Sequence, residues 1–197
     1  MSTATKRPTY ADIEALPDGV YGEILGGELF TSPRPRSPHI QSATALGVFV
    51  GGPFGYGVNG PGGWIIEYEP ELLLDVDPDF CPVVPDLAGW RETTLPLLTD
   101  DGLFTVAPDW VCEILSPRTA ATDRSLKMPF YARCGIGHMW LIDPIVRTLE
   151  AFRLENGRWT VLGTWRDDAE VRAEPFDAVA LPLGMLWRHR TRETPPP

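Results

Sequence analysis

The stretch Trp110-Val-Cys-Glu-Ile-Leu115 is a short, almost wholly apolar run with one carboxylate, Glu113, in its interior. Its length and its aromatic and β-branched residues predict a buried strand. A second short apolar run contains Pro85-Asp86 and places Asp86 in the same kind of setting. A carboxylate within such a strand is costly unless it is paired, binds a metal or lies at a cleft. Because neighbouring strands lie about 4.8 Å apart, these two acids can share one cation.

Two carboxylates on neighbouring strands suit Mg²⁺, which proteins bind through one or two carboxylates together with water and substrate phosphate. The alternative for either acid is an ion pair with an arginine or the cap of a turn. Residues 67–101 hold ten acids and one base, Arg91, whereas residues 116–134 hold four bases and one acid, Asp123. A positive patch beside a negative one is what a metal–phosphate site requires.

Lys127 is the third candidate residue. Of the 17 basic residues fifteen are arginine, and the only lysines are Lys6, near the N-terminus, and Lys127. Burial can lower the pKa of a lysine, which then orients or activates water, whereas a guanidinium stays charged. The alternative is a surface ion pair with Asp123 at i,i+4, which an arginine would serve equally well. The composition favours a functional role for Lys127.

Length and charge limit the class of protein. The 197 residues fit one domain, expected over residues 1–187, followed by a polar, proline-ended tail at 188–197 that we expect to be disordered. A formal charge of −10 argues against nonspecific wrapping of DNA. Three widely spaced cysteines argue against a disulfide framework or a zinc site. With no apolar run of about 18 residues and a polar start, the chain is expected to be cytoplasmic.

Hydrophobic periodicity and turn signals predict a mixed order of helices and strands. Helices are expected at residues 9–16, at 39–50, and from 119 or 122 to 134, the last kinked or starting late because of Pro129. Strands are expected at residues 20–25, 28–31, 64–74, 83–90, 109–115, 138–143, 147–154 and 158–165. The last three are expected to be antiparallel, with a tight turn at Asn156-Gly157. Residues 32–38, 51–63 and 91–108 are expected to be connectors or loops.

An ordered set of these segments resembles the Uma2 family. The set is Glu23-Ile-Leu-Gly-Gly-Glu28, Ser37-Pro-His39, Val84-Pro-Asp-Leu87, Pro108-Asp-Trp-Val-Cys-Glu-Ile-Leu-Ser-Pro117, Asp123 with Lys127 and Tyr131, and Trp140-Leu-Ile-Asp-Pro144. That family is assigned to the PD-(D/E)XK superfamily of restriction-endonuclease-like proteins. The resemblance, from about residue 10 to residue 154, implies an α/β (α+β) fold. Its core would be a mixed central sheet flanked by helices, with N-terminal and C-terminal β-hairpins.

The superfamily pattern is a Pro-Asp, then an acid, one residue and a lysine, all converging on a divalent metal. Asp86 matches the first acid and Glu113 the second, but Leu115 stands where the pattern has lysine. The resemblance implies that this lysine has moved to the following helix, as Lys127. Asp86 and Glu113 would then hold Mg²⁺ or Mn²⁺, while Lys127 would position water or stabilise the developing phosphorane charge.

The implied reaction is hydrolysis of a phosphodiester in DNA by an endonuclease, and a homodimer is expected because cleavage of a duplex needs two sites. Glu23, His39 and Tyr131 match family positions and are possible supporting residues, with packing or structural hydrogen bonding as the alternative. Arg118 and Arg124 are possible phosphate contacts, with surface solvation as the alternative. The competing hypothesis is a catalytically silent nuclease-fold module that binds a protein or nucleic-acid partner, favoured by the acidic surface and by Leu115.

Overall fold

A six-stranded mixed sheet forms the centre of the protein. The computed structural model describes residues 7–32, 37–95 and 103–187. The strands are ordered β10-β9-β8-β7-β5-β3, and within the sheet β7 and β8 are parallel whereas the other neighbours are antiparallel. Their bounds are β3 (Trp64–Tyr68), β5 (Leu87–Arg91), β7 (Trp110–Ile114), β8 (His138–Asp143), β9 (Thr148–Glu155) and β10 (Arg158–Arg166). The expected mixed central sheet of an α+β fold is therefore confirmed.

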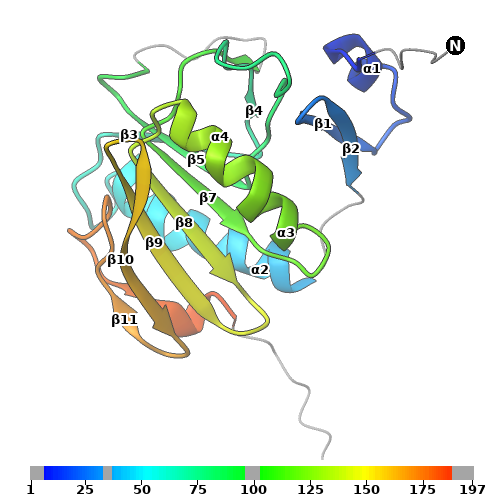
Figure 1. Cartoon of the computed structure of the whole chain (residues 1–197). Helices are drawn as coiled ribbons and strands as arrows, with labels where there is room; N and C mark the ends of the chain where they lie inside the picture. Colours follow the sequence, from blue (N-terminus) through cyan, green and yellow to red (C-terminus); the bar gives the residue numbers. More distant parts are fainter. Residues whose placement is uncertain (1–6, 33–36, 96–102, 188–197) are drawn as a thin grey trace, which may run out of the picture.

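The expected strand containing Glu113 is β7, and all five of its residues are buried. Alternate residues of a strand point to opposite faces of a sheet. Trp110, Cys112 and Ile114 thus join the core beneath α2 (Ser37–Leu46), while Val111 joins the core beneath α4 (Met128–Arg133). Figure 1 shows α2 behind the sheet and α3 (Ala120–Thr122) with α4 in front of it. Covering both faces explains why β7 is apolar on both faces, apart from Glu113, rather than alternating.

The three sequential strands expected after residue 137 are confirmed. β8 pairs with β9 and β9 with β10, both in antiparallel register. Asn156 and Gly157 connect β9 to β10 with positive φ angles of 51° and 74°. A two-residue hairpin turn with both central residues at positive φ favours the Asn-Gly pair.

The second expected helix is longer than the sequence pattern indicated. α2 begins at Ser37, and the chain continues without a break into a π-helical segment, η1 (Gly47–Gly55). The expectation of a loop over residues 51–63 is therefore wrong for its first five residues. Val50 and Phe54 are 1% and 2% exposed, so burial against the sheet holds this glycine-rich stretch in a helix despite its low propensity. Pro53 lies inside it, where wide π turns accommodate a residue that lacks an N–H.

The third expected helix is also continuous. α3 leads into a π-helical segment, η2 (Asp123–Lys127), and then into α4, with Pro129 as its second residue. The expected kink at Pro129 is replaced by the π turn directly before it, which absorbs the missing hydrogen bond. The helix ends where Gly135 adopts a φ of 74°.

The N-terminal segment forms a small separate layer. The expected first helix is α1 (Tyr10–Glu14), where the Asp12 carboxylate accepts hydrogen bonds from the Thr9 backbone N–H and hydroxyl, both at 2.7 Å. The hairpin of β1 (Tyr21–Leu25) and β2 (Glu28–Ser32) is confirmed. It docks through backbone hydrogen bonds from Ile24 to Pro82 and from Cys81 to Ile24. Docking places the inward side chains of β1 beside the start of β5.

Two predicted segments differ from the structure in detail. The expected strand at 64–74 is interrupted after β3 and resumes only as the two-residue β4 (Glu71–Leu72). The expected loop at 91–108 contains β6 (Leu103–Phe104), which pairs in parallel with β4. Expectations for residues 33–36 of the connector, for 96–102 and for the tail at 188–197 lie outside the described residues.

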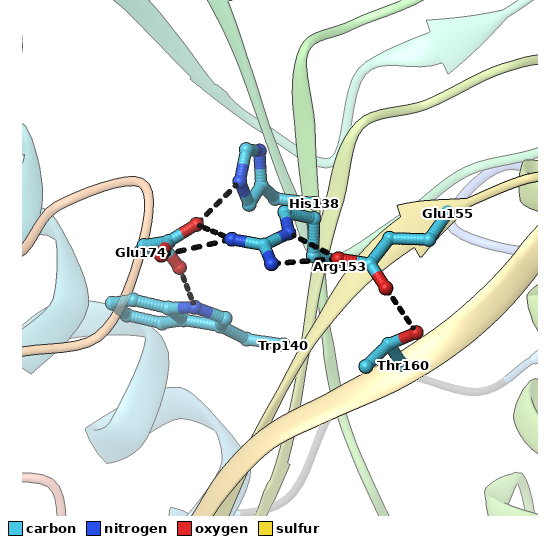
Figure 2. Close-up of polar contacts among 6 residues, drawn as sticks. All are labelled: His138, Trp140, Arg153, Glu155, Thr160 and Glu174. Carbon is cyan, nitrogen blue, oxygen red and sulfur yellow. Dashed lines mark hydrogen bonds and ion pairs between the residues drawn. The ribbon is translucent and has the colours of Figure 1, made fainter.

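The C-terminal segment contains β11 (Glu170–Val171), β12 (Leu181–Pro182) and a 3₁₀ turn, η3 (Leu183–Met185), which the sequence did not predict. A polar cluster fastens it to the sheet (Figure 2). Glu174 accepts hydrogen bonds from Arg153 at 3.0 Å and, at its backbone carbonyl, from the Trp140 indole at 2.7 Å. Burial lowers the pKa of His138, although its hydrogen bond with Glu174 opposes the shift. We assign this cluster a structural role.

Among the described residues, no helix is long and apolar enough to cross a membrane. Cys81, Cys112 and Cys134 are free thiols. Burial raises the pKa of Cys112 well above its usual range and that of Cys134 to about 11. Because the thiolate is the reactive form, neither of these two is suited to act as a nucleophile.

Candidate active site

Asp86 and Glu113 face each other across two neighbouring strands. Leu87 on β5 is paired with Cys112 on β7, and continuing this antiparallel register by one residue brings Asp86 opposite Glu113. Directly opposed residues have Cβ atoms about 5 Å apart. Both acids lie on the sheet face that α4 covers, because they are two residues from the paired Ala88 and Val111 of that core. The expected convergence of these two side chains is thus a consequence of strand register.

The Asp86 carboxylate is held by two donors from different elements. Its Oδ2 accepts a hydrogen bond from the Ile114 backbone N–H at 2.5 Å. Its Oδ1 lies 2.8 Å from Nε2 of His39, which belongs to the first turn of α2. Burial lowers the pKa of His39, but the hydrogen bond and charge of Asp86 outweigh it, so the net pKa is raised. The other ring nitrogen, Nδ1, is buried without a hydrogen-bond partner among the described residues.

Lys127 reaches the same site from the helix layer. Its side chain is 6% exposed, and its Nζ lies 2.9 Å from Oε1 of Glu23 and 3.4 Å from Oε1 of Glu113. The ammonium also donates to the backbone carbonyl of Val84 at 2.7 Å. Lys127 is therefore an interior residue that joins β1, the start of β5 and β7. The alternative of a surface ion pair with Asp123 is wrong, since Asp123 is itself only 3% exposed.

Tyr131 and Glu23 complete the contacts around Lys127. The Tyr131 hydroxyl donates a hydrogen bond to Glu113 Oε1 at 2.6 Å, and the ring is fully buried one turn after Lys127. The Glu23 carboxylate accepts the backbone N–H of Val84 at 2.7 Å. The structure thus brings together six of the predicted residues. Glu23, Asp86, Glu113, Lys127 and Tyr131 lie in one cluster, and His39 joins it through its contact with Asp86. We call Glu23, Asp86, Glu113, Asp123, His39, Lys127 and Tyr131 the acid–lysine site.

The acid–lysine site holds more buried acids than bases. Burial raises the pKa of Glu113 well above its usual range; Lys127 opposes this, and the neighbouring acids reinforce it. Burial likewise raises the pKa of Asp123 to about 6, against the opposing charge of Lys127. Glu23, Glu113 and Asp123 thus act on one ammonium, while Asp86 is paired with His39, and the surplus of carboxyl groups over basic groups would be relieved by a bound cation.

The expected lowering of the Lys127 pKa is wrong. Burial alone lowers it, but the charges of Glu113, Glu23 and Asp123 outweigh burial and raise the pKa above its ordinary value. Lys127 is consequently a permanent ammonium. It can attract and orient anionic oxygens, but it cannot take a proton from water.

Two further acids lie in this region, and neither is among the site residues expected from the sequence. Asp123 belongs to the set that resembles the family, and its i,i+4 spacing to Lys127 places both on one helix face. Glu69 follows β3 with a φ of 47° and donates its backbone N–H to the Asp86 carbonyl at 3.0 Å. Burial raises the pKa of Glu69, and the charge of Asp86 adds to this rise. The alternation of acids at 67, 69 and 71 is typical of a solvated strand face and does not indicate that Glu69 lies beside Asp86.

The two candidate phosphate contacts lie outside this cluster. The Arg124 guanidinium is exposed and lies 2.8 Å from Glu150 Oε1 on β9. Arg118 is exposed in the connection between β7 and α3, where its backbone N–H donates to Ser116 Oγ at 3.3 Å. Neither arginine contacts Asp86 or Glu113 in the described contacts, so a role in phosphate binding stays a prediction.

The side chains present offer the type of ligand that a magnesium ion prefers, although they do not form a complete coordination sphere. Among the described residues, no group of three or more His, Cys, Asp or Glu side chains is arranged to hold a metal ion. Mg²⁺ usually takes only one or two carboxylates and completes its shell with water and substrate phosphate. Asp86 and Glu113 supply that number of hard oxygen donors, within a cluster in which Lys127 only partly offsets the neighbouring acids.

A mixed sheet with opposed acids and a buried lysine at one end is the arrangement that the restriction-endonuclease-like resemblance implies. The crystal structure of a "putative nuclease belonging to DUF820" from Anabaena variabilis ATCC 29413 has the same fold, with a TM-score of 0.66. The two chains are 22% identical over 91% of this chain and 97% of the other. The family model Uma2, described as "Putative restriction endonuclease", matches residues 8–184, so the chain belongs to the Uma2 family. None of the curated proteins compared with the chain matches it significantly.

Proposed function

We propose that this protein is a metal-dependent endonuclease that hydrolyses phosphodiester bonds in DNA. The observation that carries this proposal is Lys127, whose Nζ lies 3.4 Å from Glu113 Oε1 within a buried cluster of acids. A nuclease needs both a binding site for a cation and a positive group for the phosphate, and the acid–lysine site offers both within one layer of side chains. Membership of a restriction-endonuclease-like family supports the same reaction class.

Asp86 and Glu113 would hold the metal, Mg²⁺ or Mn²⁺. When bound there, such an ion supplies Lewis-acid polarisation of the phosphate and makes a nearby water more acidic. His39 and the Ile114 N–H fix the orientation of the Asp86 carboxylate through its two oxygens. Tyr131 fixes that of Glu113. These partners preorganise the two carboxylates before any ligand arrives.

Lys127 would contribute an ammonium to the charge that develops on the phosphoryl oxygens. Its raised pKa keeps it charged at any physiological pH, and its contacts with Glu23 and the Val84 carbonyl fix its position. Fixed charges in a site that excludes water stabilise a transition state without reorganising. The proton of the attacking water must go to another acceptor, for which the carboxylates of the acid–lysine site are available.

A second candidate function is that of a silent nuclease-fold module that binds a protein or nucleic-acid partner. It is favoured by the contacts already present, because both oxygens of Asp86 and one oxygen of Glu113 accept hydrogen bonds from the protein. In this case Lys127 would serve to neutralise buried acids rather than to act on phosphate.

Metal titration separates the two candidates. We expect millimolar Mg²⁺ or Mn²⁺ to raise the melting temperature of the wild type, and this rise to vanish in Asp86→Asn and Glu113→Gln. A supercoiled plasmid should be nicked by the wild type in Mg²⁺ and not by Lys127→Met. Tyr10→Phe, which changes a hydroxyl bonded to Glu71 elsewhere in the chain, is the control. Absence of both the shift and the nicking would refute the enzyme and favour the silent module.

We further propose that the protein acts in the cytoplasm as a homodimer, since two sites are needed to cut both strands of a duplex. Sedimentation of the wild type at micromolar concentration tests this. A monomer at every concentration would limit the activity to nicking.

A further inference from the structure

An open groove lies between α4 and the hairpin that joins β9 to β10. Its volume is about 550 Å³. Three arginines line it, namely Arg124, Arg133 and Arg158, and between them lie the apolar side chains of Met128, Ala132 and Trp159. It is formed by the outer surface of the helix whose inner surface carries Tyr131 to the acid–lysine site. We call it the arginine groove.

The charge of the arginine groove is opposite to that of the protein. The chain carries a formal charge of −10, yet all three charged residues of this lining are basic. Arg124 and Arg133 are paired with Glu150 at 2.8 Å and Asp77 at 3.0 Å, but their side chains are 42% and 45% exposed. Exposed ion pairs contribute little, so either arginine can exchange its partner for a phosphate. Arg158 has no ion-pair partner within the described parts of the chain.

Trp159 gives the arginine groove a rigid aromatic element. Its indole N–H donates to the Met128 carbonyl at 2.8 Å, which ties the start of β10 to the start of α4 and fixes the ring. The ring is only partly buried, so part of it lines the groove. Trp159 also packs against the core beneath α4, so its position in the groove lining is fixed from below.

The arginine groove lies within reach of the acid–lysine site. Glu113 is in register with Leu141 on β8, and Leu141 is in register with Glu150 on β9. Residues in register share a face, so Glu150 lies on the face of Glu113, two strand spacings or roughly 10 Å away. Arg124 is bonded to Glu150 and therefore marks the near end of the groove. A nucleic-acid strand covers such a distance in about three nucleotides.

We propose that the arginine groove binds a single-stranded segment of nucleic acid that continues from the phosphodiester at the acid–lysine site. This inference rests on the proposed function and names its substrate class: DNA with unpaired nucleotides beside the cleaved bond. Arginines bind the phosphates, and the apolar floor with Trp159 receives an unstacked base, the combination by which proteins hold single strands. A duplex would present phosphates to the arginines but would leave the apolar floor without a partner.

Binding is measured without cleavage, by fluorescence anisotropy of a labelled oligothymidine and of a matched duplex, with wild-type protein in EDTA. The oligothymidine should bind more tightly than the duplex. Arg158→Ala should reduce the slope of log K against log salt concentration by about 0.7, the share of one phosphate of a single strand. Trp159→Leu should weaken binding roughly 5- to 160-fold, and Trp159→Phe should restore most of it. Arg166→Ala, at the far end of the same strand, should change neither quantity.

Three results would overturn the inference. They are binding by the Arg158 and Trp159 variants that equals that of the wild type, tighter binding of the duplex than of the oligothymidine, and no binding of either oligonucleotide. Thermal melting of each variant shows that it is folded. Cleavage is scored separately in Mg²⁺. If the variants lose binding but the wild type does not nick DNA, the binding role of the arginine groove stands and the proposed nuclease activity is refuted. If the wild type nicks DNA but the variants bind as well as it does, the nuclease activity stands and the role of the groove is refuted.

Discussion

Replacing Lys127 by methionine removes the one ammonium of the acid–lysine site while keeping the length of the side chain. The residue is 5% exposed and contacts Glu23, Glu113 and the Val84 carbonyl. Removing one partner of a buried ion pair leaves an uncompensated charge and costs about 3–5 kcal/mol. For a chain of this size, such a loss lowers the melting temperature by roughly 6–20 °C.

The stability lost in Lys127→Met should also depend on pH, and the direction of this dependence follows from the carboxyl groups. The folded pKa of Asp123 is raised from 3.8 to about 6, and that of Glu113 is raised well above its usual range, so both are harder to keep charged in the folded protein. Without Lys127 these carboxyls are repelled more strongly still. The deficit of Lys127→Met should therefore be largest at pH 8 and shrink as the pH falls towards 5, where the acids take up protons.

Urea unfolding at pH 5, 6.5 and 8 measures this deficit. Arg166→Met is the matched control, because Arg166 is 82% exposed and surface changes usually stay within about 0.5 kcal/mol. The double variant Lys127→Met with Glu113→Gln should recover part of the loss at pH 8. A deficit below about 1 kcal/mol at pH 8, or one that does not change with pH, would refute the description of Lys127 as the charge that holds the acids together.

Three further predictions concern the same site. Asp123→Asn should stabilise the metal-free protein by about 3 kcal/mol at pH 8, because its carboxyl titrates near 6 rather than 3.8, and by almost nothing at pH 3.5, where both forms are neutral; equal effects at the two pH values in urea unfolding would contradict this. Tyr131→Phe should cost about 1–3 kcal/mol, the usual loss when a buried hydrogen-bond acceptor is left without its donor, measured by thermal or urea unfolding; an unchanged midpoint would show that this bond contributes nothing. Saturating Mg²⁺ at 100 times its Kd should stabilise the wild type by about 2.7 kcal/mol, and chelation should remove the gain; a gain that persists in Asp86→Asn would place the ion elsewhere.

The sequence predicted those strands and turns that depend on residues close to one another in the chain. The strands from residue 138 to 166 follow from alternation and from Asn156-Gly157, whose positive φ angles select the turn. The strand around Glu113 follows from a short apolar run bounded by loops. By contrast, the part of η1 after residue 50 could not be predicted, because its glycines and Pro53 disfavour a helix locally. Only burial of Val50 and Phe54 against the sheet, a tertiary contact, overrides that preference.

Most members of the candidate site were predictable, but Asp123 and the electrostatics of the site were not. Asp86 and Glu113 stood out because acids in apolar strands are rare, and Lys127 because arginine is used almost everywhere else. Their meeting follows from strand register, which single segments do not reveal. The direction of the Lys127 pKa could not be foreseen, because it depends on how many carboxylates surround the ammonium. Burial and neighbouring charge act in opposite directions there, and only the folded arrangement decides between them.

The π-helical turn η2 makes the length of the chain a component of the site. A π turn contains one residue more than the α turn that could replace it, and each residue of an α-helix turns the chain by about 100°. Deleting the exposed Ser125 would keep every functional side chain and would leave α4 with Tyr131 against the sheet. The wide turn would close to an α turn, so the helix on either side would keep its orientation, whereas Asp123 and Lys127 would become i,i+3 instead of i,i+4 neighbours. The extra residue of η2 thus sets the spacing of these two buried side chains, and the length of the chain there contributes to the site beside the residues themselves.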